Sequence, residues 1–528
     1  MNNIELSIFS NKISAICEEM GEVLRLSSFS PNIKDRMDFS CAIFDKDGNL
    51  CAQAAHIPVH LGSMAFAMKD VIETIDWFTG DMVVFNDPFK GGTHLPDVTI
   101  VAPVFINNEI IAYVANRAHH ADIGSESAGS MPISKHINEE GILISPTKII
   151  EQGELNEEFL QNLIKPMICH QTSRGDFMAQ ISANHIGLKR LLTLIQETGE
   201  KVFQSALDEL NQYAQRICLN LIKDIPNGQY HACDFMEDDG FSQNLLKIQV
   251  FIKVSDHVIE VDFKGTANQS TGNINCPLSV AAAAVYYVFR CLMPDNTPAS
   301  AGSFWPIKIT APKNSVINAS YPAAVAAGNV ETSSRIVDVI LAALQKALPD
   351  RIPAASYGSM NNIAMGNNEQ QDSSDTNNTG SNKKWSYYET IGGGFGASAN
   401  GDGLSAKQAH MTNTLNTPIE SFESHYPLRI TEYSIRTDDQ KLLEIEANKQ
   451  NQGGKGLIRC YEFLDDTQVT LLTERRKIAP WGVNGAEDGL VGENLLDGKI
   501  LPGKTSIKVK QGQKLCIKTP NGGNWRGI

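Results

Sequence analysis

The sequence predicts an α+β protein, a mixed multi-subdomain chain with extended β-sheets in its N- and C-terminal parts and a helical middle. Short apolar runs separated by turn residues fill positions 38 to 120, which is typical of strands. Long segments with helical periodicity and few glycines fill 155 to 223. The region after residue 384 is Gly-rich and β-like, and a chain of 528 residues has room for about three domains.

The first 150 residues predict an N-terminal helix followed by a β-rich region, which we treat as one unit, 1–150. Apolar residues recur at helical spacing over 4–26, which indicates an amphipathic helix. The segment DFSCAIFDKDGNLCAQ, which begins at Asp38, consists of two apolar runs joined by a turn and predicts a β-hairpin. A second hairpin is expected in DVTIVAPVFINNEIIAYVANR, with Asn107 and Asn108 at its turn.

The later boundaries follow from changes in composition. We expect a helical region over 151–226, an α/β region over 227–360 and a Gly-rich β-like C-terminal region over 385–528. Residues 361–384 are rich in Asn, Ser, Asp and Gln and contain almost no large apolar groups. Because such a segment cannot bury enough surface to offset its ordering entropy, we expect a disordered insertion there.

Charge and composition exclude several classes of function. The chain carries 60 acidic and 45 basic residues, for a net charge of −15 at pH 7, which argues against nucleic-acid binding and a basic membrane-binding face. The longest apolar run, Val280 to Phe289, is shorter than the roughly 20 residues that a membrane span takes. The N-terminus lacks a secretion signal, and none of the 10 cysteines forms C-x-x-C. We therefore expect a cytoplasmic protein with reduced, mostly buried thiols.

The densest polar constellation lies in the motifs GGTHLPD and NRAHHAD, which contain His94, Asp97, His119, His120 and Asp122. The second predicted hairpin separates the two motifs, so we expect it to return His119 close to His94. Imidazole nitrogens and carboxylate oxygens at such a meeting point suit Zn, Mn or Fe in the divalent state. Because successive strand residues point to opposite faces, His119 and His120 are not both expected to be ligands.

Structural interpretations of the same residues remain open. Asp97 could cap the next element, and His120 could be a satisfied surface residue. The Gly-rich run 392–396 could cradle a ligand or form a structural turn. The chain contains neither a G-x-x-x-x-G-K-[ST] phosphate loop nor a G-x-S-x-G nucleophile elbow.

Several long motifs in the same order give the sequence a recognisable pattern. NDPFKGGTHLPDVTIVAPVF, NRAHHADIG, GDFMAQISANHIG, DFKGTANQSTGNIN and YYETIGGGFGA together resemble the hydantoinase B/oxoprolinase family, over about residues 3–525. That family includes N-methylhydantoinase B components, the C-terminal half of 5-oxoprolinases, caprolactamase B components and the related acetone carboxylase subunit. The resemblance therefore implies an enzyme subunit.

The resemblance also implies a ligand set for a divalent metal. The family positions fall on His94, Asp97 and His119, all of which keep the required side chains. A further carboxylate ligand is implied in the motif DRMDFS, which we place on Asp38, with Asp35 as the second choice.

His120 and Asp122 are then expected as catalytic groups that transfer protons. The resemblance implies that ATP is bound by an actin-like partner, the hydantoinase A-type ATPase subunit, in a hetero-oligomer. The expected activity is ATP-dependent hydrolysis of a small cyclic amide such as a hydantoin or 5-oxoproline. The alternatives are a subunit of an ATP-dependent ketone carboxylase of acetone carboxylase type and a noncatalytic scaffold subunit.

The C-terminal motifs depart from the family pattern. The Gly-rich ending appears as TPNGGNW over 519–525, and a second Gly-rich segment keeps only Gly453, Gly454 and Gly456. The departures leave the substrate open, whereas the expected metal ligands are unaffected.

Overall fold

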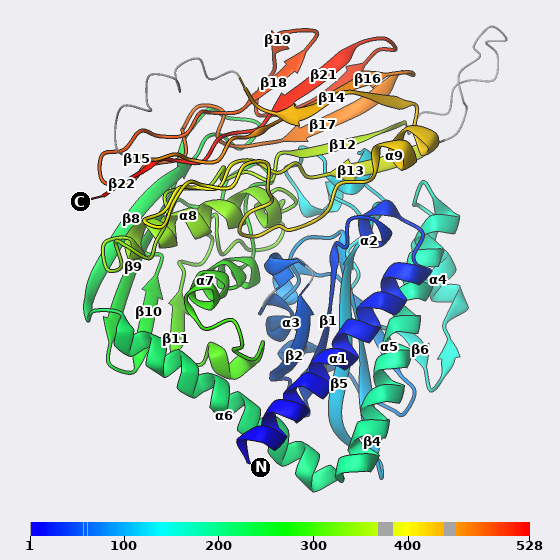
Figure 1. Ribbon diagram of the computed structural model, residues 1–528. Coiled ribbons are helices and arrows are strands. Elements are labelled where there is room, and N and C mark those ends of the chain that lie inside the picture. The colour runs from blue at the N-terminus through cyan, green and yellow to red at the C-terminus, as the bar shows by residue number, and fades with distance from the viewer. Residues whose placement is uncertain are drawn as a thin grey trace, which may run out of the picture.

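A computed structural model gives the structure of residues 2–55, 57–60, 62–125, 127–367, 384–437 and 450–527. Helices and several mostly antiparallel sheets alternate along the chain, which confirms the expected α+β class. In Figure 1 the two C-terminal sheets form an upper layer above the N-terminal and central units. Within the described segments, no helix is both long and apolar enough to cross a membrane.

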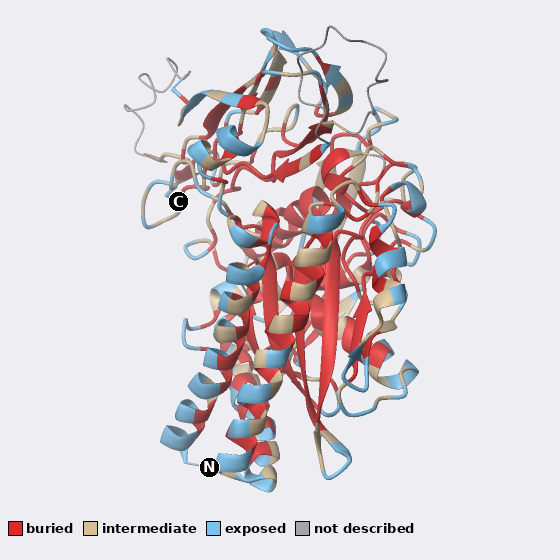
Figure 2. Cartoon of the chain, turned by 90° about the vertical axis from the view of Figure 1, so that its right-hand side faces the viewer, coloured by how far each residue is buried: buried red, intermediate tan, exposed pale blue. Residues whose placement is uncertain are grey.

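The N-terminal unit is built on a seven-stranded antiparallel sheet of order β2-β1-β5-β4-β3-β6-β7. Helices α1 (Asn3–Ser27) and α5 (His170–Thr198) pack on one face, and α3 (Ser63–Thr74) packs on the other. Figure 2 shows the strands buried between the helices, whose outer surfaces are exposed. The strands are β1 (Phe39–Asp45), β2 (Leu50–Ala55), β3 (Met82–Phe85), β4 (Asp97–Ile106), β5 (Glu109–His119), β6 (Thr147–Glu151) and β7 (Glu154–Leu155).

The two predicted hairpins of this unit are present. Strands β1 and β2 pair antiparallel, as do β4 and β5. The β4–β5 turn places Asn107 and Asn108 at positive φ, 50° and 65°, which is the left-handed region that a tight hairpin turn requires and that Asn tolerates. At the other end of this hairpin, Asp97 pairs directly with His119.

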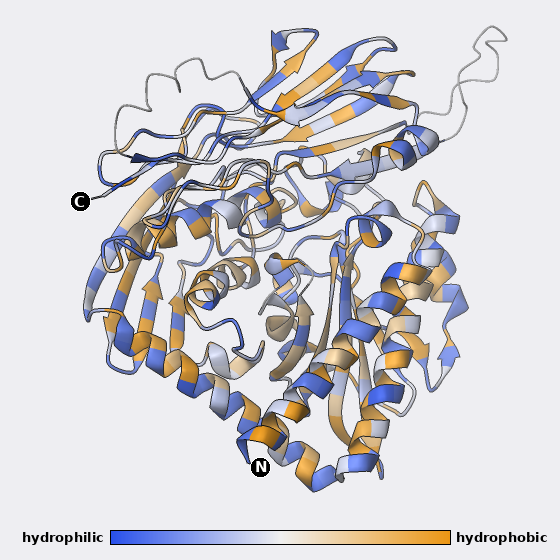
Figure 3. Cartoon of the chain, in the orientation of Figure 1, coloured by the Kyte–Doolittle hydropathy of each residue, from blue (hydrophilic) through white to orange (hydrophobic). Residues whose placement is uncertain are grey.

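Long helices form the middle of the chain, as the periodicity predicts. Helix α4 (Glu157–Ile164) leads into α5, and α6 (Glu200–Asp224) follows after Gly199, whose φ is 82°. Apolar and polar stripes run along α1, α5 and α6 in Figure 3, and the apolar stripes face the sheet and one another.

The central α/β unit consists of a four-stranded sheet of order β11-β10-β9-β8 and two helices. Helices α7 (Leu278–Leu292) and α8 (Ser333–Leu344) pack together, and α8 also packs on β8 and β9. A π-helical turn, Gly328–Thr332, precedes α8. The strands are β8 (Gly228–Met236), β9 (Leu246–Ser255), β10 (Val258–Asp262) and β11 (Ile307–Thr310).

The C-terminal unit contains two larger sheets, of order β13-β12-β17-β20 and β14-β16-β21-β18-β19, that share one apolar core, and a two-stranded sheet of β15 and β22. Two short helices, α2 (Pro31–Lys34) and α9 (Ile419–His425), lie between this unit and the N-terminal unit in Figure 1. The strands are β12 (Asn362–Asn367), β13 (Trp385–Glu389), β14 (Leu428–Ile435), β15 (Gln450–Asn451), β16 (Leu457–Phe463), β17 (Thr467–Leu472), β18 (Glu493–Leu496), β19 (Lys499–Ile500), β20 (Lys504–Val509), β21 (Lys514–Lys518) and β22 (Trp525–Arg526).

The start of the segment expected to be a disordered insertion, 361–384, is an ordered strand. Residues 362–367 form β12, which pairs with both β13 and β17. The prediction was wrong here because Ile363 and Met365 are fully buried in the C-terminal core, although the segment around them is polar. The remainder of the predicted insertion, 368–383, lies outside the described residues.

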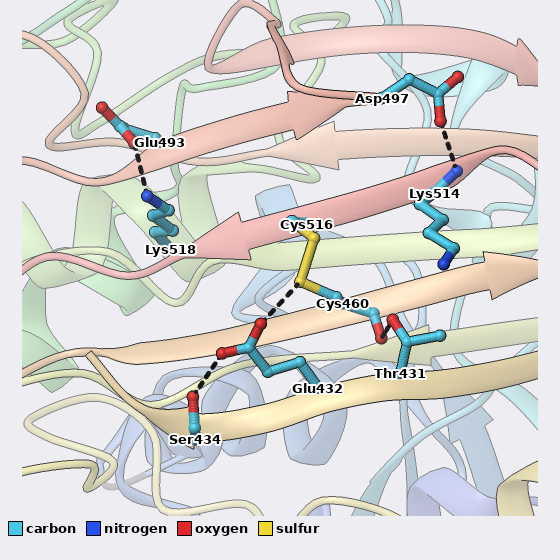
Figure 4. Close-up of a disulfide and its surroundings, with 9 residues drawn as sticks. All are labelled: Thr431, Glu432, Ser434, Cys460, Glu493, Asp497, Lys514, Cys516 and Lys518. Atoms are coloured by element: carbon cyan, nitrogen blue, oxygen red, sulfur yellow. Dashed lines mark hydrogen bonds and ion pairs between the residues drawn. A yellow bond between two sulfur atoms is a disulfide. The ribbon is translucent and has the colours of Figure 1, made fainter. Parts of the chain in front are cut away.

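Two cysteines are bonded, contrary to the expectation of reduced thiols. Cys460 of β16 and Cys516 of β21 are directly opposed in an antiparallel pair and form a disulfide (Figure 4). The other eight cysteines are not disulfide-bonded, and five of them are buried. Because the bonded pair is 56 residues apart and meets only through strand register, no sequence spacing indicates it.

Candidate metal centre

The ends of β4 and β5 define the candidate site. Asp97 is the first residue of β4 and His119 the last residue of β5, and the two are paired across the ladder. His94 lies one turn before β4, and the Asp97 amide donates to the His94 carbonyl oxygen at 3.1 Å. Pro96 keeps this segment out of a helix, so His94 projects from a loop that folds back onto the strand ends.

Three side chains meet at this point: His94, Asp97 and His119, which we call the triad. The Asp97 Oδ1 atom lies 3.2 Å from His94 Nε2 and 3.3 Å from His119 Nδ1. One potential ligand atom from each of the three residues lies within 4.8 Å of the other two. All three side chains are almost completely buried. The two nitrogens and one oxygen therefore face a common point.

The hydrogen bonds of His94 define its tautomer. Its Nδ1 lies 3.1 Å from the Ala326 carbonyl oxygen, which can only accept, so Nδ1 carries the hydrogen. In the neutral ring Nε2 then presents a lone pair toward Asp97. This buried Nε2 has no hydrogen-bond partner in the described part of the chain, and neither has His119 Nε2. Buried nitrogens are rarely left without a hydrogen-bond partner, and binding to a cation would explain why these two have none.

The second oxygen of Asp97 has a different set of contacts. Asp97 Oδ2 accepts hydrogen bonds from Thr93 Oγ1 at 2.5 Å and from Asn329 Nδ2 at 3.2 Å. His60 Nε2 lies 3.4 Å from the same oxygen, while His60 Nδ1 is 3.1 Å from Ser40 Oγ. Oδ2 is therefore held by the protein, and Oδ1 is the oxygen left facing the two triad imidazoles.

Electrostatics within the triad favour a charged carboxylate. Burial alone raises the pKa of Asp97, but His94 and His60 outweigh it and hold that pKa well below its usual range. Burial likewise lowers the pKa of His94, but Asp97 outweighs it and raises that pKa above its usual value. A proton on His94 thus occupies the position where a cation would bind, and the two compete.

Two glycines are required by the loop that carries His94. Gly91 has φ 87°, and a Cβ there would lie 2.3 Å from the Ala67 backbone nitrogen of α3. A Cβ on Gly92 would lie 2.6 Å from the Asp87 carbonyl oxygen. The loop is thus pressed against α3, which explains the paired glycines of GGTHLPD.

The two candidates for the fourth carboxylate are in different places. Asp38 Oδ2 lies 3.9 Å from His119 Nδ1, and the Asp38 carbonyl oxygen accepts the His119 amide at 3.0 Å. Asp38 also lines a small cavity beside the triad, which has room for about one water molecule. Asp35 lines a separate surface pocket together with His120 and His425. The structure therefore places Asp38, and not Asp35, next to the triad.

His120 and Asp122 face away from the triad. His120 Nε2 lies 2.9 Å from Gln180 Oε1 of α5, and its ring packs on Phe177. Asp122 accepts backbone amides of Gly124, Ile168 and Cys169. These contacts give His120 a place in the sheet–helix packing and give Asp122 a role in holding two loops together.

Two neighbours of the triad, His60 and Asn329, were not among the residues expected from the sequence. His60 belongs to a 3₁₀ turn before α3, and Asn329 to the π-helical turn before α8. The histidine-containing segment HIPVH is the one local signal for His60, and Asn329 lies 232 residues from Asp97 in the chain. Both reach the site only through tertiary packing.

The Gly-rich run 392–396 has a structural role. A Cβ on Gly394 would lie 1.8 Å from the Gly454 carbonyl oxygen, and one on Gly396 would lie 1.8 Å from the Ala354 carbonyl oxygen. These glycines allow backbones from distant segments to touch, so the structural alternative is favoured over ligand binding for this run.

The fold and the site define a class of large α+β chains in which an antiparallel hairpin ends in a buried His–Asp–His triad. More specifically, the chain belongs to the hydantoinase B/oxoprolinase family, whose profile matches residues 2–526. An uncharacterized protein of Methanocaldococcus jannaschii is 40% identical over 99% of this chain and 91% of its own length.

Named relatives differ in how much of their length the chain covers. The chain is 36% identical to 5-oxoprolinase 1 of Arabidopsis thaliana, over 99% of the chain but 42% of that protein. It is 31% identical to the B component of a putative D-/L-hydantoinase of Pseudomonas sp., over 99% of the chain and 89% of that protein. The chain therefore corresponds to less than half of the plant 5-oxoprolinase and to most of the hydantoinase component.

Two solved structures share the fold. The ATP-dependent caprolactamase from Pseudomonas jessenii superposes with a TM-score of 0.88 at 24% identity, covering 100% of this chain and 91% of that one. Acetone carboxylase superposes with a TM-score of 0.85 at 15% identity, covering 100% of this chain and 76% of that one. At these identities the likeness shows the fold.

Proposed function

We propose that this chain is the B-type component of an ATP-dependent enzyme that hydrolyses the C–N bond of a small cyclic amide, of hydantoinase or 5-oxoprolinase type. The observation that carries the proposal is the buried triad, which offers two imidazole nitrogens and one carboxylate oxygen within 4.8 Å of one another. Membership of the hydantoinase B/oxoprolinase family supplies the reaction class.

The triad fits a divalent cation of the Zn, Mn or Fe type. Nitrogen and carboxylate donors together suit these metals better than Mg or Ca, which prefer oxygen alone. The unpartnered Nε2 of His94 and the Oδ1 of Asp97 that faces it fit the role of ligands. We propose His94, Asp97 and His119 as ligands and Asp38 as the fourth. When bound, such a metal polarises carbonyl oxygens and lowers the pKa of water.

The protein groups around the triad have separable tasks. Thr93 and Asn329 orient the Asp97 carboxylate, and the Ala326 carbonyl oxygen orients the His94 ring. Asp38, the proposed fourth ligand, also lines the adjoining cavity. Because His120 and Asp122 face away, we do not assign them a proton-transfer step.

ATP is proposed to bind to a partner of the hydantoinase A type. One relative is named as the B component of a hydantoinase, and more than half of the plant 5-oxoprolinase lies outside the matched part. An unactivated amide is a poor electrophile, and phosphoryl transfer to its oxygen by the partner would create a good leaving group. The active form would then be a hetero-oligomer.

Two alternatives make distinct predictions. The shared fold with acetone carboxylase favours, as second candidate, a subunit that carboxylates a ketone with ATP and bicarbonate. A noncatalytic scaffold subunit would purify in a folded form without metal.

The test is to purify the chain with its A-type partner and follow ATP consumption with 5-oxoproline, hydantoins, and acetone plus bicarbonate in parallel. The proposal expects turnover with a cyclic amide, and loss of both metal and turnover in His94→Ala. His185→Ala is the matched control because His185 is exposed on α5. Turnover with acetone plus bicarbonate but with none of the cyclic amides, or full turnover by metal-free protein, would contradict the proposal.

A further inference from the structure

The cavity beside the triad has a wall made of hydrogen-bond donors. Its lining includes Asp38 and His119 from the N-terminal unit, and Tyr388 with three threonines from the C-terminal unit. We call the threonines, Thr390, Thr412 and Thr414, the hydroxyl cluster. All three are at least 97% buried. They follow β13, so the C-terminal unit supplies this wall and the N-terminal unit supplies the triad.

The hydroxyl cluster has one more hydroxyl hydrogen than its internal hydrogen bonds use. Thr390 Oγ1 and Thr414 Oγ1 are 2.7 Å apart, and Thr412 Oγ1 lies 3.3 Å from Thr414 Oγ1. These two contacts use two of the three hydroxyl hydrogens. In the segments that the structure describes, no carbonyl or carboxylate oxygen accepts from any of the three hydroxyls. At least one hydroxyl hydrogen is therefore left for an acceptor from outside the chain.

A buried guanidinium adds to the donor excess. Arg36 is 0% exposed, and its Nη2 donates to Thr390 at 3.2 Å and to Thr414 at 3.4 Å. Its Nη1 donates to neutral oxygens of Asn32 and Tyr388, and its Nε has no hydrogen-bond partner among the residues that the structure describes. Arg36 fills acceptor positions on Thr390 and Thr414, so the hydroxyl hydrogen that the internal contacts leave over is directed away from Arg36.

Arg36 is also a buried cation without a counter-ion. Among the described residues no carboxylate lies within ion-pair distance of it, and its charge is met by hydroxyls, amide oxygens and the Tyr388 ring at 4.9 Å. Arg117, near Asp97, is likewise buried and bonded to neutral oxygens of Thr99 and Ser63. Buried charges are normally paired, so an anion bound nearby would supply the counter-charge that Arg36 lacks among the described residues.

We propose that the hydroxyl cluster, backed by Arg36, binds an anionic oxygen of the substrate beside the metal centre. This inference rests on the proposed function and names the substrate class: a cyclic amide that carries a carboxylate, or whose amide oxygen has received a phosphoryl group. Arg36 is a positioning residue because it acts through the threonine hydroxyls. Thr390, Thr412 and Thr414 are the groups that contact the anion.

The test compares anionic and neutral probes by isothermal titration of the purified full-length chain. The probes are 5-oxoproline, which carries a carboxylate, 2-pyrrolidinone, which is the same lactam without it, and inorganic phosphate. Hydrogen bonds to a charged group predict that an anionic probe binds about tenfold more tightly than 2-pyrrolidinone. A preference for 5-oxoproline identifies a carboxylate, and a preference for phosphate alone identifies a phosphoryl group.

The main variant is Thr412→Val, which removes one hydroxyl at constant volume and leaves the Arg36 contacts in place. We expect it to reduce the anion preference at least threefold without changing metal content or binding of 2-pyrrolidinone. Thr417→Val is the matched control, because Thr417 is equally buried but lines a different pocket. Arg36→Met should abolish the preference, and its circular dichroism spectrum and metal content check that it is folded.

The proposal is overturned if neither anion binds more tightly than 2-pyrrolidinone, or if Thr412→Val keeps the full preference. These results are independent of turnover. Failure of the proposed function would instead appear as a complex that hydrolyses no cyclic amide, whatever the chain alone binds.

Discussion

Replacing Asp97 by Asn can keep the oxygen that is hydrogen-bonded to the protein and replace the oxygen that we propose as a metal ligand with nitrogen. Oδ2 accepts hydrogen bonds from Thr93 and Asn329, and the amide oxygen of an Asn side chain can accept the same two. Oδ1 faces His94 Nε2 at 3.2 Å, and the amide nitrogen that replaces it would donate to that lone pair. Asp97→Asn should therefore fold normally but lose its affinity for a cation.

The size of the effect follows from binding linkage. With free metal at one hundred times its dissociation constant, binding stabilises the folded wild type by about 2.7 kcal/mol. Loss of a residue that hydrogen-bonds to a metal ligand can lower metal affinity about 100-fold, and loss of the ligand itself should lower it at least as much. The same metal concentration then stabilises Asp97→Asn by about 0.4 kcal/mol or less. Without metal, the two proteins should differ by about 1 kcal/mol or less, because the donors of Thr93 and Asn329 keep their acceptor.

The assay is thermal unfolding with and without added metal after chelation, together with metal content by plasma mass spectrometry. Asp122→Asn is a matched control, because the Asp122 oxygens accept only backbone amides and lie away from the triad. A wild-type metal content or a wild-type metal-dependent shift in Asp97→Asn would refute the reasoning.

Other predictions concern the control residue, the disulfide, an ion pair and the metal itself. Asp122→Asn should lower the free energy of unfolding by about 1–3 kcal/mol, since backbone amides lose a charged acceptor, while its metal content stays at the wild-type level. Replacing Cys460 and Cys516 by Ser should lower the free energy of unfolding by up to about 4 kcal/mol, because the disulfide closes a loop of 56 residues; a stability independent of reductant would contradict this. Burial raises the pKa of Asp234, but Arg335 and Arg475 outweigh it and lower that pKa to about 2, from a model-peptide value of 3.8. Its stabilisation is therefore present above pH 3.8 and lost as pH falls through 2, so Asp234→Asn should cost about 2 kcal/mol at pH 7 and progressively less below pH 4 in urea titrations. Chelation of the native complex should abolish amide hydrolysis, and adding Zn, Mn and Fe singly should identify the ion that restores it.

The hairpin that carries the site follows directly from the sequence. Two β-rich runs joined by Asn107-Asn108 fix both the pairing of β4 with β5 and the end at which His94, Asp97 and His119 meet. Alternation along a strand is equally local, and the structure indeed turns His120 toward α5 while His119 faces Asp97. These features depend on residues of a single hairpin and its flanking loop.

The surroundings of the triad could not be predicted in the same way. Asn329 and the hydroxyl cluster arrive from segments more than 200 residues away, and their positions depend on how the central and C-terminal units pack. Asp122 is expected from the motif NRAHHAD to transfer protons, yet it accepts hydrogen bonds from backbone amides of a distant loop. Residue type and spacing do not reveal which side-chain atoms remain unpartnered after folding, and those atoms define this site.

The most direct test of the metal centre is a crystal structure of the purified chain with anomalous diffraction collected at the absorption edge of the metal that co-purifies. The account predicts one strong anomalous peak about 2.0–2.2 Å from His94 Nε2, Asp97 Oδ1 and a ring nitrogen of His119. No peak at full metal content, or a peak outside this triad, would contradict it.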